Sequence, residues 1–359
     1  MTAVFVTGML RSGTTLGQTL LTNHPDALVA YQPFHQLYVD TKQLFLDEAG
    51  LTQALPLDDG VLQANDMAER FTAWLGRRRF SHAEAVGLFA RATAGKGGGL
   101  PSLRIQPKRG GSFAELLEEA HLTMASALGR AAPPVLGSKE ILCEEFVPHL
   151  VDSGTRCLLV IRDPRAVVAS AGLGAYRRAV GDRYPFRLLL GLWRKSARYW
   201  LRYRRDPAVL TIRYEDLVQS PAKTLSVATA WLGLPAFSPE ILVAPLLDHA
   251  GKRWSGNSSF GTQVGIGAGS LDRWQTLLGD REARFIAACA RREMDAIGYP
   301  VPADIAVADI TSFQEDVADV RPAYLRRYPF DAEAKASEVA RFTSVPATGE
   351  QALDRRRPA

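Results

Sequence analysis

The hydrophobic positions near the start of the chain predict a strand that leads into a helix. Residues 4–6 form a short apolar run of the kind found in buried strands. After a turn bounded by glycines, Leu16, Leu20 and Leu21 lie on one face of a helical pattern. The Asn-His-Pro sequence at residues 23–25 ends that pattern. This part of the chain is therefore a strand, a tight loop and a helix.

The same alternation returns along the chain. Short apolar runs typical of strands buried in a parallel sheet occur at residues 27–30, 135–138, 156–161 and 209–212. Helical patterns follow at about residues 165–173, 186–204, 221–232 and 280–294. Strands alternating with helices indicate an α/β fold with a central parallel β-sheet flanked by helices.

A helical insertion is expected at about residues 40–130, with breaks at Pro56, at Gly76 and at residues 95–99. Within it, Ser112 and Glu115 form a capping box before an apolar stripe of helical period. Two further helix starts are predicted where Asp163 and Ser220 each precede a proline. We expect residues 1–300 to form the main domain, followed by a C-terminal extension at 301–359 with a disordered tail.

Composition limits the functional classes. The 359 residues contain no apolar run of about 18, so no membrane span is expected. The three cysteines, Cys143, Cys157 and Cys289, predict reduced core thiols and a cytoplasmic protein. No Cys-x-x-Cys pair or His/Cys cluster indicates a metal site. The net charge of +5 fits an anionic ligand, although such a charge is more often just a soluble surface. The basic residues of the helical insertion are interpreted as a solvated face, with an acidic acceptor as the alternative.

The loop between the first strand and helix predicts an anion site. Backbone N–H groups and the positive end of the helix dipole point at one place there. The pattern is related to the nucleotide P-loop, G-x-x-x-x-G-K-[ST], but Gly13 is followed by Thr14 and Thr15 instead of lysine. Arg11 lies two residues before Gly13. The fold is thus P-loop-like, and the site suits a phosphate-like group rather than a Mg-nucleoside triphosphate.

A second anion site is predicted after the strand at 156–161. Arg162 stands at the carboxyl end of this strand, where ligands of open α/β sheets bind. Ser170 lies two turns into the following helix. A guanidinium and a hydroxyl placed in this way suit a second phosphate.

These stretches together resemble the sulfotransferases that use 3′-phosphoadenosine 5′-phosphosulfate (PAPS). The resemblance extends from residue 3 to about residue 298, and includes the Arg-Tyr-Glu-Asp-Leu segment at 213–217 and the stretches at 257–260 and 271–274. It implies transfer of a sulfuryl group to a hydroxyl, or less often an amine, of an unidentified small-molecule or carbohydrate acceptor, without metal. It implies neither a nucleic-acid partner nor an oligomeric state.

The resemblance also implies roles for individual residues. The loop Arg11, Ser12, Gly13, Thr14 and Thr15 would bind the 5′-phosphosulfate, with Arg11 supplying a fixed positive charge. The 3′-phosphate would be bound by Arg162 and Ser170, and the adenine would lie near Tyr214. Lys139 would contact the transferring sulfuryl group. In the late cofactor loop, Ser258 would donate to the leaving oxygen, with Ser259 as an alternative binding residue and Phe260 packing on the cofactor.

The general base is the main departure from the family pattern. The glutamate of many relatives aligns with Gln32, which cannot accept a proton in this role. His35, three residues on, is a candidate because imidazole titrates close to neutral pH. Its alternative role is a hydrogen-bonded residue in the cleft wall. The carboxylates of Glu140, Glu144 and Glu145 are further candidates.

Two other functions remain open at this point. A P-loop kinase of a small molecule is disfavoured by the missing lysine and by the lack of an obvious Mg²⁺-binding partner. A non-catalytic nucleotide-binding relative is suggested by the replacement of the expected glutamate by Gln32.

Overall fold

The computed structural model describes residues 1–57, 60, 62, 66–94, 100, 103–130, 133–174, 183–256 and 266–344. Within these residues the chain divides into two compact units. The first comprises the described parts of 1–161, 206–256 and 266–267, and the second those of 162–205 and 268–344. Each unit is described by itself.

The first unit is built on a five-stranded parallel sheet in the order β2-β3-β1-β4-β5. The strands are β1 Thr2–Thr7, β2 Ala27–Tyr31, β3 Val135–Lys139, β4 Arg156–Ile161 and β5 Val209–Arg213. The chain moves from β1 to one side of the sheet and later to the other side, so that β1 and β4 are neighbours at a switch point. Open α/β sheets bind ligands outside the carboxyl ends of such strands. The predicted fold class, a central parallel sheet flanked by helices, is confirmed.

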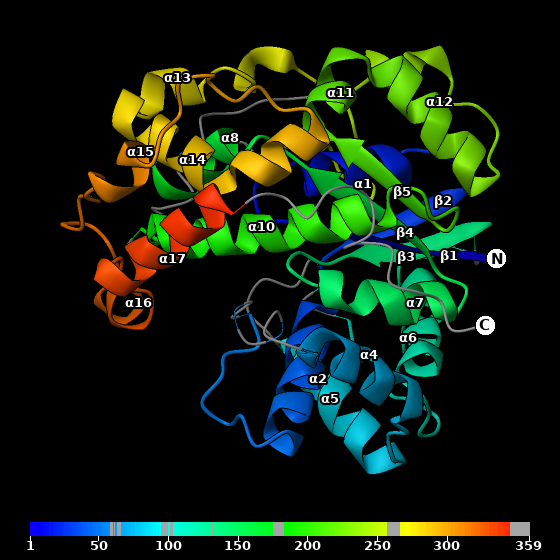
Figure 1. Ribbon diagram of the computed structural model, residues 1–359. Coiled ribbons are helices and arrows are strands. Elements are labelled where there is room, and N and C mark those ends of the chain that lie inside the picture. Colours follow the sequence, from blue (N-terminus) through cyan, green and yellow to red (C-terminus); the bar gives the residue numbers. More distant parts are fainter. Residues whose placement is uncertain are drawn as a thin grey trace. The chain divides into compact units, whose positions relative to one another are not determined.

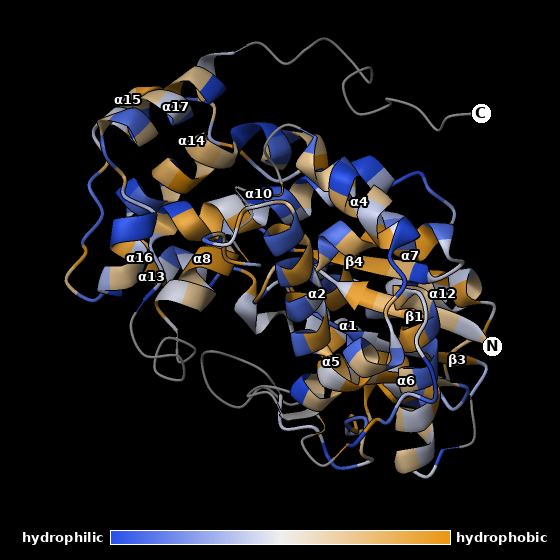
Figure 2. Ribbon diagram, turned by 90° about the horizontal axis from the view of Figure 1, so that it is seen from below, coloured by the Kyte–Doolittle hydropathy of each residue, from blue (hydrophilic) through white to orange (hydrophobic). Residues whose placement is uncertain are grey.

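Helices cover both faces of this sheet (Figure 1). Helices α1, α11 and α12 lie over one face, and α6 and α7 over the other (Figure 1). Their bounds are α1 Thr14–Thr22, α6 Phe113–Ala127, α7 Val147–Asp152, α11 Tyr214–Gln219 and α12 Pro221–Leu232. The strands β1 and β4 are predominantly hydrophobic along their length (Figure 2). Val4 and Val6 of β1 are fully buried, as the apolar run predicts.

The segment predicted to be a helical insertion contains four described helices in the first unit. These are α2 His35–Glu48, α4 Met67–Arg77, α5 His82–Ala94 and α6. Helix α4 ends one residue after the break predicted at Gly76, whereas the break predicted at 95–99 lies outside the described residues. The capping box is present at the start of α6, where the Ser112 hydroxyl accepts the Glu115 N–H and the Glu115 carboxylate accepts the Ser112 N–H.

The two predicted helix starts before proline have different outcomes. The Asp163 carboxylate accepts the N–H of Arg165 and caps α8 Pro164–Gly172 as predicted. The prediction that the Ser220 side chain caps α12 is wrong, because it makes no capping hydrogen bond. Ser220 is also the residue that ends α11, and its N–H donates to the carbonyl of Asp216. Its backbone joins two successive helices and does not have the extended conformation usual for an N-cap.

The second unit is helical. It contains α8 Pro164–Gly172, α10 Phe186–Tyr203, η3 Ala268–Ser270, α13 Trp274–Leu277, α14 Asp280–Ile297, α15 Ala308–Thr311, α16 Pro322–Arg327 and α17 Ala332–Thr343. Arg194 of α10 forms a two-fold hydrogen-bonded ion pair with Glu338 of α17, with N···O distances of 2.6 and 2.8 Å. A second pair joins Arg341 of α17 to Glu293 of α14. Helix α17 is therefore fixed to α10 and α14 by charged pairs.

Two predictions about the chain as a whole concern its ends and its environment. The tail expected to be disordered, at residues 354–359, lies outside the described residues. Over the part of the chain that is described, no helix is both long and apolar enough to span a bilayer.

Candidate functional site

The loop between β1 and α1 requires glycine at both of its ends. A Cβ atom at Gly8 would lie 2.3 Å from the carbonyl oxygen of Val160, and one at Gly13 would lie 2.2 Å from Cδ2 of Tyr214. Both glycines have positive φ angles, +150° and +89°. Arg11 between them is also left-handed, with φ +65°, which is unusual for a residue with a side chain. At Gly8 and Gly13 the backbone therefore lies too close to neighbouring residues for any side chain to fit.

The start of α1 is open to an anion. Gly13 is the N-cap residue, and no side chain caps this helix. The first N–H groups of a helix have no partner within the helix, and with the dipole they attract negative charge. Thr14 and Thr15 form the first turn, and Ser12, which is part of the loop, is fully buried. The predicted loop residues are therefore together, in the geometry expected of a phosphate-binding turn.

Tyr214 packs against this loop. It follows β5 directly as the first residue of α11, and its ring lies against Gly13. Tyr214 is buried, with 7% of the residue exposed. The structure accordingly places Tyr214 beside the loop that the sequence predicts to bind the phosphosulfate.

Lys139 and Gln32 form a second part of the site. Lys139 ends β3 and pairs in register with Tyr31, the last residue of β2. Its ammonium is buried, donates to the side-chain oxygen of Gln32 at 3.0 Å and lies 4.3 Å from the centre of the Tyr31 ring. Burial lowers the pKa of Lys139 to about 7; the carboxyl of Glu140 opposes this shift and the charge of Arg11 adds to it.

The candidate base His35 lies beside Glu140. His35 begins α2, and its Nδ1 is 3.8 Å from Oε2 of the fully buried Glu140. The other oxygen of Glu140, Oε1, accepts the N–H of Phe34 at 3.0 Å. Burial raises the pKa of Glu140 to about 8, while the Phe34 N–H, the Lys139 charge and the Ser138 hydroxyl act in the opposite direction. The structure thus brings two of the predicted candidates, His35 and Glu140, together.

The other two candidate carboxylates lie on the 3₁₀ turn η1 Glu144–Phe146, and both are buried. Glu145 forms an ion pair with Lys42 at 2.9 Å, in which both side chains are buried. The ammonium of Lys42 also donates to the carbonyl of Leu142 at 3.0 Å. This arrangement gives Glu145 a structural role, since a buried carboxylate without its partner is costly.

The residues predicted to bind the second phosphate belong to the second unit. Arg162 follows Ile161, the last residue of β4, and its Nη2 donates to the carbonyl of Ser270 at 2.5 Å. Its own carbonyl accepts the indole N–H of Trp193 at 2.7 Å. Ser170 is buried on α8. The backbone that carries Arg162 and Ser170 is thus fixed by the capped start of α8 and by Trp193.

The segment that the family resemblance assigns to a late cofactor loop falls partly outside the described residues. Ser258, Ser259 and Phe260 lie outside the described residues. In the described part, the ring of Trp274 lies 4.3 Å from the guanidinium of Arg165, which in turn binds Asp163. The aromatic residue of this segment therefore packs on an arginine of α8.

Sequence reasoning missed the contact between Gln32 and Lys139, and the hydrogen bond from Phe34 to Glu140. Both depend on the carboxyl ends of β2 and β3 lying next to each other. The available signal was the strand order of a P-loop-like sheet, which makes residues after the two strands neighbours. Within the described residues, no group of three or more His, Cys, Asp or Glu has the arrangement of a metal site.

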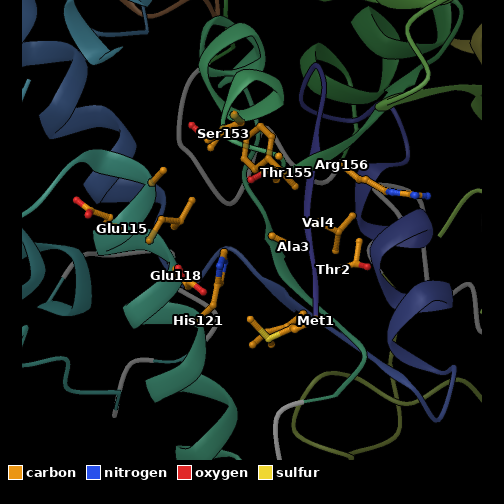
Figure 3. Close-up of a pocket in the computed structure, with 16 residues that line it drawn as sticks. Met1, Thr2, Ala3, Val4, Glu115, Glu118, His121, Ser153, Thr155 and Arg156 are labelled. Atoms are coloured by element: carbon orange, nitrogen blue, oxygen red, sulfur yellow. The ribbon is translucent and has the colours of Figure 1, made fainter. Parts of the chain in front are cut away.

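A separate cavity lies away from this site, at the amino ends of β1 and β4 between α6 and α7 (Figure 3). Its volume is about 490 Å³, and its lining includes Met1, Glu118, His121, Thr155 and Arg156. None of the predicted site residues lines it.

The sequence model of the sulfotransferase domain family matches residues 141–250. The chain carries a sulfotransferase domain. The match covers less than half of the chain, and it bears out the predicted sulfotransferase family over residues 141–250. The matched segment includes Arg162, Ser170 and Tyr214, whereas the loop after β1, His35 and Lys139 precede it.

Solved structures that are similar to this chain include two sulfotransferase domains and a retinol dehydratase. The sulfotransferase domain from the curacin biosynthetic pathway is 18% identical, with 84% of this chain and 99% of that chain covered and a TM-score of 0.48. The sulfotransferase domain of the Synechococcus PCC 7002 olefin synthase is also 18% identical, with coverages of 84% and 96% and a TM-score of 0.46. A retinol dehydratase in complex with androsterone and inactive cofactor PAP is 15% identical, with coverages of 81% and 80% and a TM-score of 0.37. No curated protein sequence matches the chain.

Proposed function

We propose that the protein transfers a sulfuryl group from PAPS to a hydroxyl, or less often an amine, of a small-molecule or carbohydrate acceptor. The observation that supports this most directly is the sulfotransferase-domain match over residues 141–250, which contains the predicted 3′-phosphate residues Arg162 and Ser170. The family resemblance assigns the 5′-phosphosulfate to the loop from Arg11 to Thr15.

The loop after β1 fits a phosphosulfate. Glycines at 8 and 13 bring the backbone close to its neighbours, and the start of α1 has no side-chain cap. Arg11 adds a fixed positive charge, which acts on Lys139 as well. These donors neutralise charge on a leaving phosphate, and they need no metal to do so. PAPS supplies the sulfuryl group and a good leaving group.

The proton of the acceptor hydroxyl is taken up by His35 in this proposal. As the acceptor oxygen bonds to sulfur, the bond between sulfur and the bridging phosphate oxygen breaks, and its electron pair leaves with the phosphate. The hydroxyl proton passes to the imidazole of His35, which is 23% exposed. Lys139 is assigned to the transferring group and Ser258 to the leaving oxygen, by resemblance to the family.

The three cysteines support a cytoplasmic location. Cys143, Cys157 and Cys289 are buried free thiols, and burial raises the pKa of Cys157 and of Cys289. Buried thiols of raised pKa are unreactive, so the protein needs no oxidising compartment. A main domain that ends near residue 300, followed by an extension, remains our prediction for the chain.

Calorimetry with two nucleotides tests the donor. The protein is titrated with adenosine 3′,5′-bisphosphate and separately with Mg-ATP. The proposal predicts tight binding of the bisphosphate and weak or no binding of Mg-ATP. Binding of Mg-ATP without binding of the bisphosphate would favour a P-loop kinase and overturn the proposal.

A further inference from the structure

The carboxyl of Glu140 is held from two sides within the first unit. Its Oε1 accepts the N–H of Phe34, the N-cap residue of α2. The hydroxyl of Ser138, on β3, also hydrogen-bonds this carboxyl. Ser138 and Glu140 are two residues apart in an extended segment, so their side chains point to the same side. The Ser138 hydroxyl is in turn 3.1 Å from Nε2 of His121. Glu140 therefore has a fixed position in a buried polar chain.

The remaining oxygen of Glu140 faces the candidate base. Oε2 is buried, lies 3.8 Å from Nδ1 of His35 and has no hydrogen-bond partner among the described residues. The histidine begins α2, directly after the residue whose N–H binds Oε1. One carboxyl thus contacts both the backbone at the start of α2 and the ring of the first residue in that helix. Catalytic hydrogen bonds are often long without ligand and shorten in the reacting complex.

We propose that Glu140 is a positioning residue that fixes the ring and tautomer of His35, so that Nδ1–H faces Glu140 and Nε2 faces the acceptor hydroxyl. This inference rests on the proposed function, and it names a residue that the family resemblance does not assign. The pairing requires the ionised form of Glu140, which predominates above its pKa of about 8. In that form the carboxylate accepts the Nδ1 proton and leaves Nε2 of His35 as the base. It also stabilises the imidazolium formed when the acceptor proton arrives.

Other titratable groups surround this carboxyl. Lys139 is adjacent on β3, and Tyr38 lies on α2, where burial and then the Glu140 charge raise its pKa. Arg11 and Cys143 act on Lys139. His121, at the far end of the polar chain, is held neutral because burial lowers its pKa to about 3. Of the groups around this carboxyl, His35 is the one whose ring nitrogen faces Oε2.

The test compares Glu140→Gln, Glu140→Ala and the control Glu118→Gln, an exposed glutamate on α6. The titration of His35 is followed by NMR of ¹⁵N-histidine-labelled protein, with its signal assigned by its loss in His35→Gln. The wild type should show a step near pH 8, where the paired Glu140 titrates. Both Glu140 variants should lose this step, and the control should keep it.

Kinetics supply the second measurement. Glu140→Ala should lower kcat about 100-fold, the lower range of general-base contributions, with unchanged KM for PAPS. Glu140→Gln should lose less, because its amide oxygen still accepts the Nδ1 proton. An unchanged His35 titration in both variants would overturn the proposal. So would a loss of bisphosphate affinity equal to the loss of kcat, because that result indicates a structural role.

The two proposals fail differently. If the wild type transfers no sulfuryl group but the His35 titration still depends on Glu140, the proposed function is wrong and the pairing is correct. If transfer occurs and the titration is independent of Glu140, the pairing is wrong and the function is correct.

Discussion

Lys139 and Gln32 exchange two hydrogen bonds. The ammonium of Lys139 donates to the side-chain oxygen of Gln32 at 3.0 Å, and the backbone N–H of Gln32 donates to the carbonyl of Lys139 at 2.9 Å. Gln32 adopts a left-handed backbone with φ +42° to make these contacts. The residue that replaces the glutamate expected from the family is therefore a neutral partner of a buried lysine.

Gln32→Glu should raise the pKa of Lys139. Burial holds this pKa at about 7 in the wild type, and a carboxylate in place of the amide oxygen favours the charged ammonium. An opposite charge at this distance typically shifts a pKa by about 1–3 units. NMR of labelled lysine side chains measures the change. The exposed position Gln219→Glu is the control, and an equal pKa in Gln32→Glu and wild type would contradict the account.

Glu140→Gln should become more stable, relative to the wild type, as the pH rises from 4.5 to 8. The folded pKa of Glu140, about 8, lies above its usual 4.5, so its stabilising contribution is complete at low pH and is lost across this interval. The glutamine variant has no such proton to lose. Urea unfolding at pH 5 and at pH 8 measures the difference, and a constant difference would contradict the raised pKa.

Gly13→Ala should destabilise the protein and weaken binding of adenosine 3′,5′-bisphosphate. The added Cβ would lie 2.2 Å from the Tyr214 ring, and the left-handed backbone alone costs about 1–2 kcal/mol for a residue with a side chain. Gly17→Ala is the matched control within α1, because its Cβ meets Val160 no closer than 3.7 Å. That control should gain up to about 1 kcal/mol from helix propensity. Urea unfolding and calorimetry separate the two variants, and equal effects would contradict the close packing of the loop.

Arg162→Ala should weaken binding of adenosine 3′,5′-bisphosphate by about 1.5–3 kcal/mol, the scale of a hydrogen bond to a charged group. The control is Arg281→Ala, an exposed arginine of α14 that contacts the carbonyl of Ser312. Calorimetry measures both affinities. Unchanged affinity in Arg162→Ala would mean that the 3′-phosphate is bound elsewhere.

Features that depend on residues close together in the chain are predicted well from the sequence. The five strands were located, and the Gly8–Thr15 loop was identified because a strand, a glycine turn and a helix are consecutive in the chain. The short helices α7 and α11 were missed, since six residues give too few turns for a clear apolar period. Ser220 was misassigned because the pattern of serine before proline does not reveal that one helix runs directly into the next.

The proximity of the candidate catalytic residues was harder to predict, because it depends on which strands are neighbours in the sheet. His35 was identified by chemistry and Glu140 by its position after a strand. Their proximity depends on the pairing of β2 with β3, as does the contact between Gln32 and Lys139. The raised pKa of Glu140 follows from complete burial, which no local sequence pattern indicates.

The measurement that tests the central claim most directly is sulfuryl transfer itself. The protein is incubated with PAPS and a panel of phenols, aliphatic alcohols, amines and sugars, and the products are analysed by mass spectrometry. We expect one acceptor class to gain a sulfuryl group with equal release of adenosine 3′,5′-bisphosphate, and His35→Ala to reduce the rate by about 100-fold or more. Tight bisphosphate binding without transfer to any acceptor would contradict the account and indicate a non-catalytic nucleotide-binding protein.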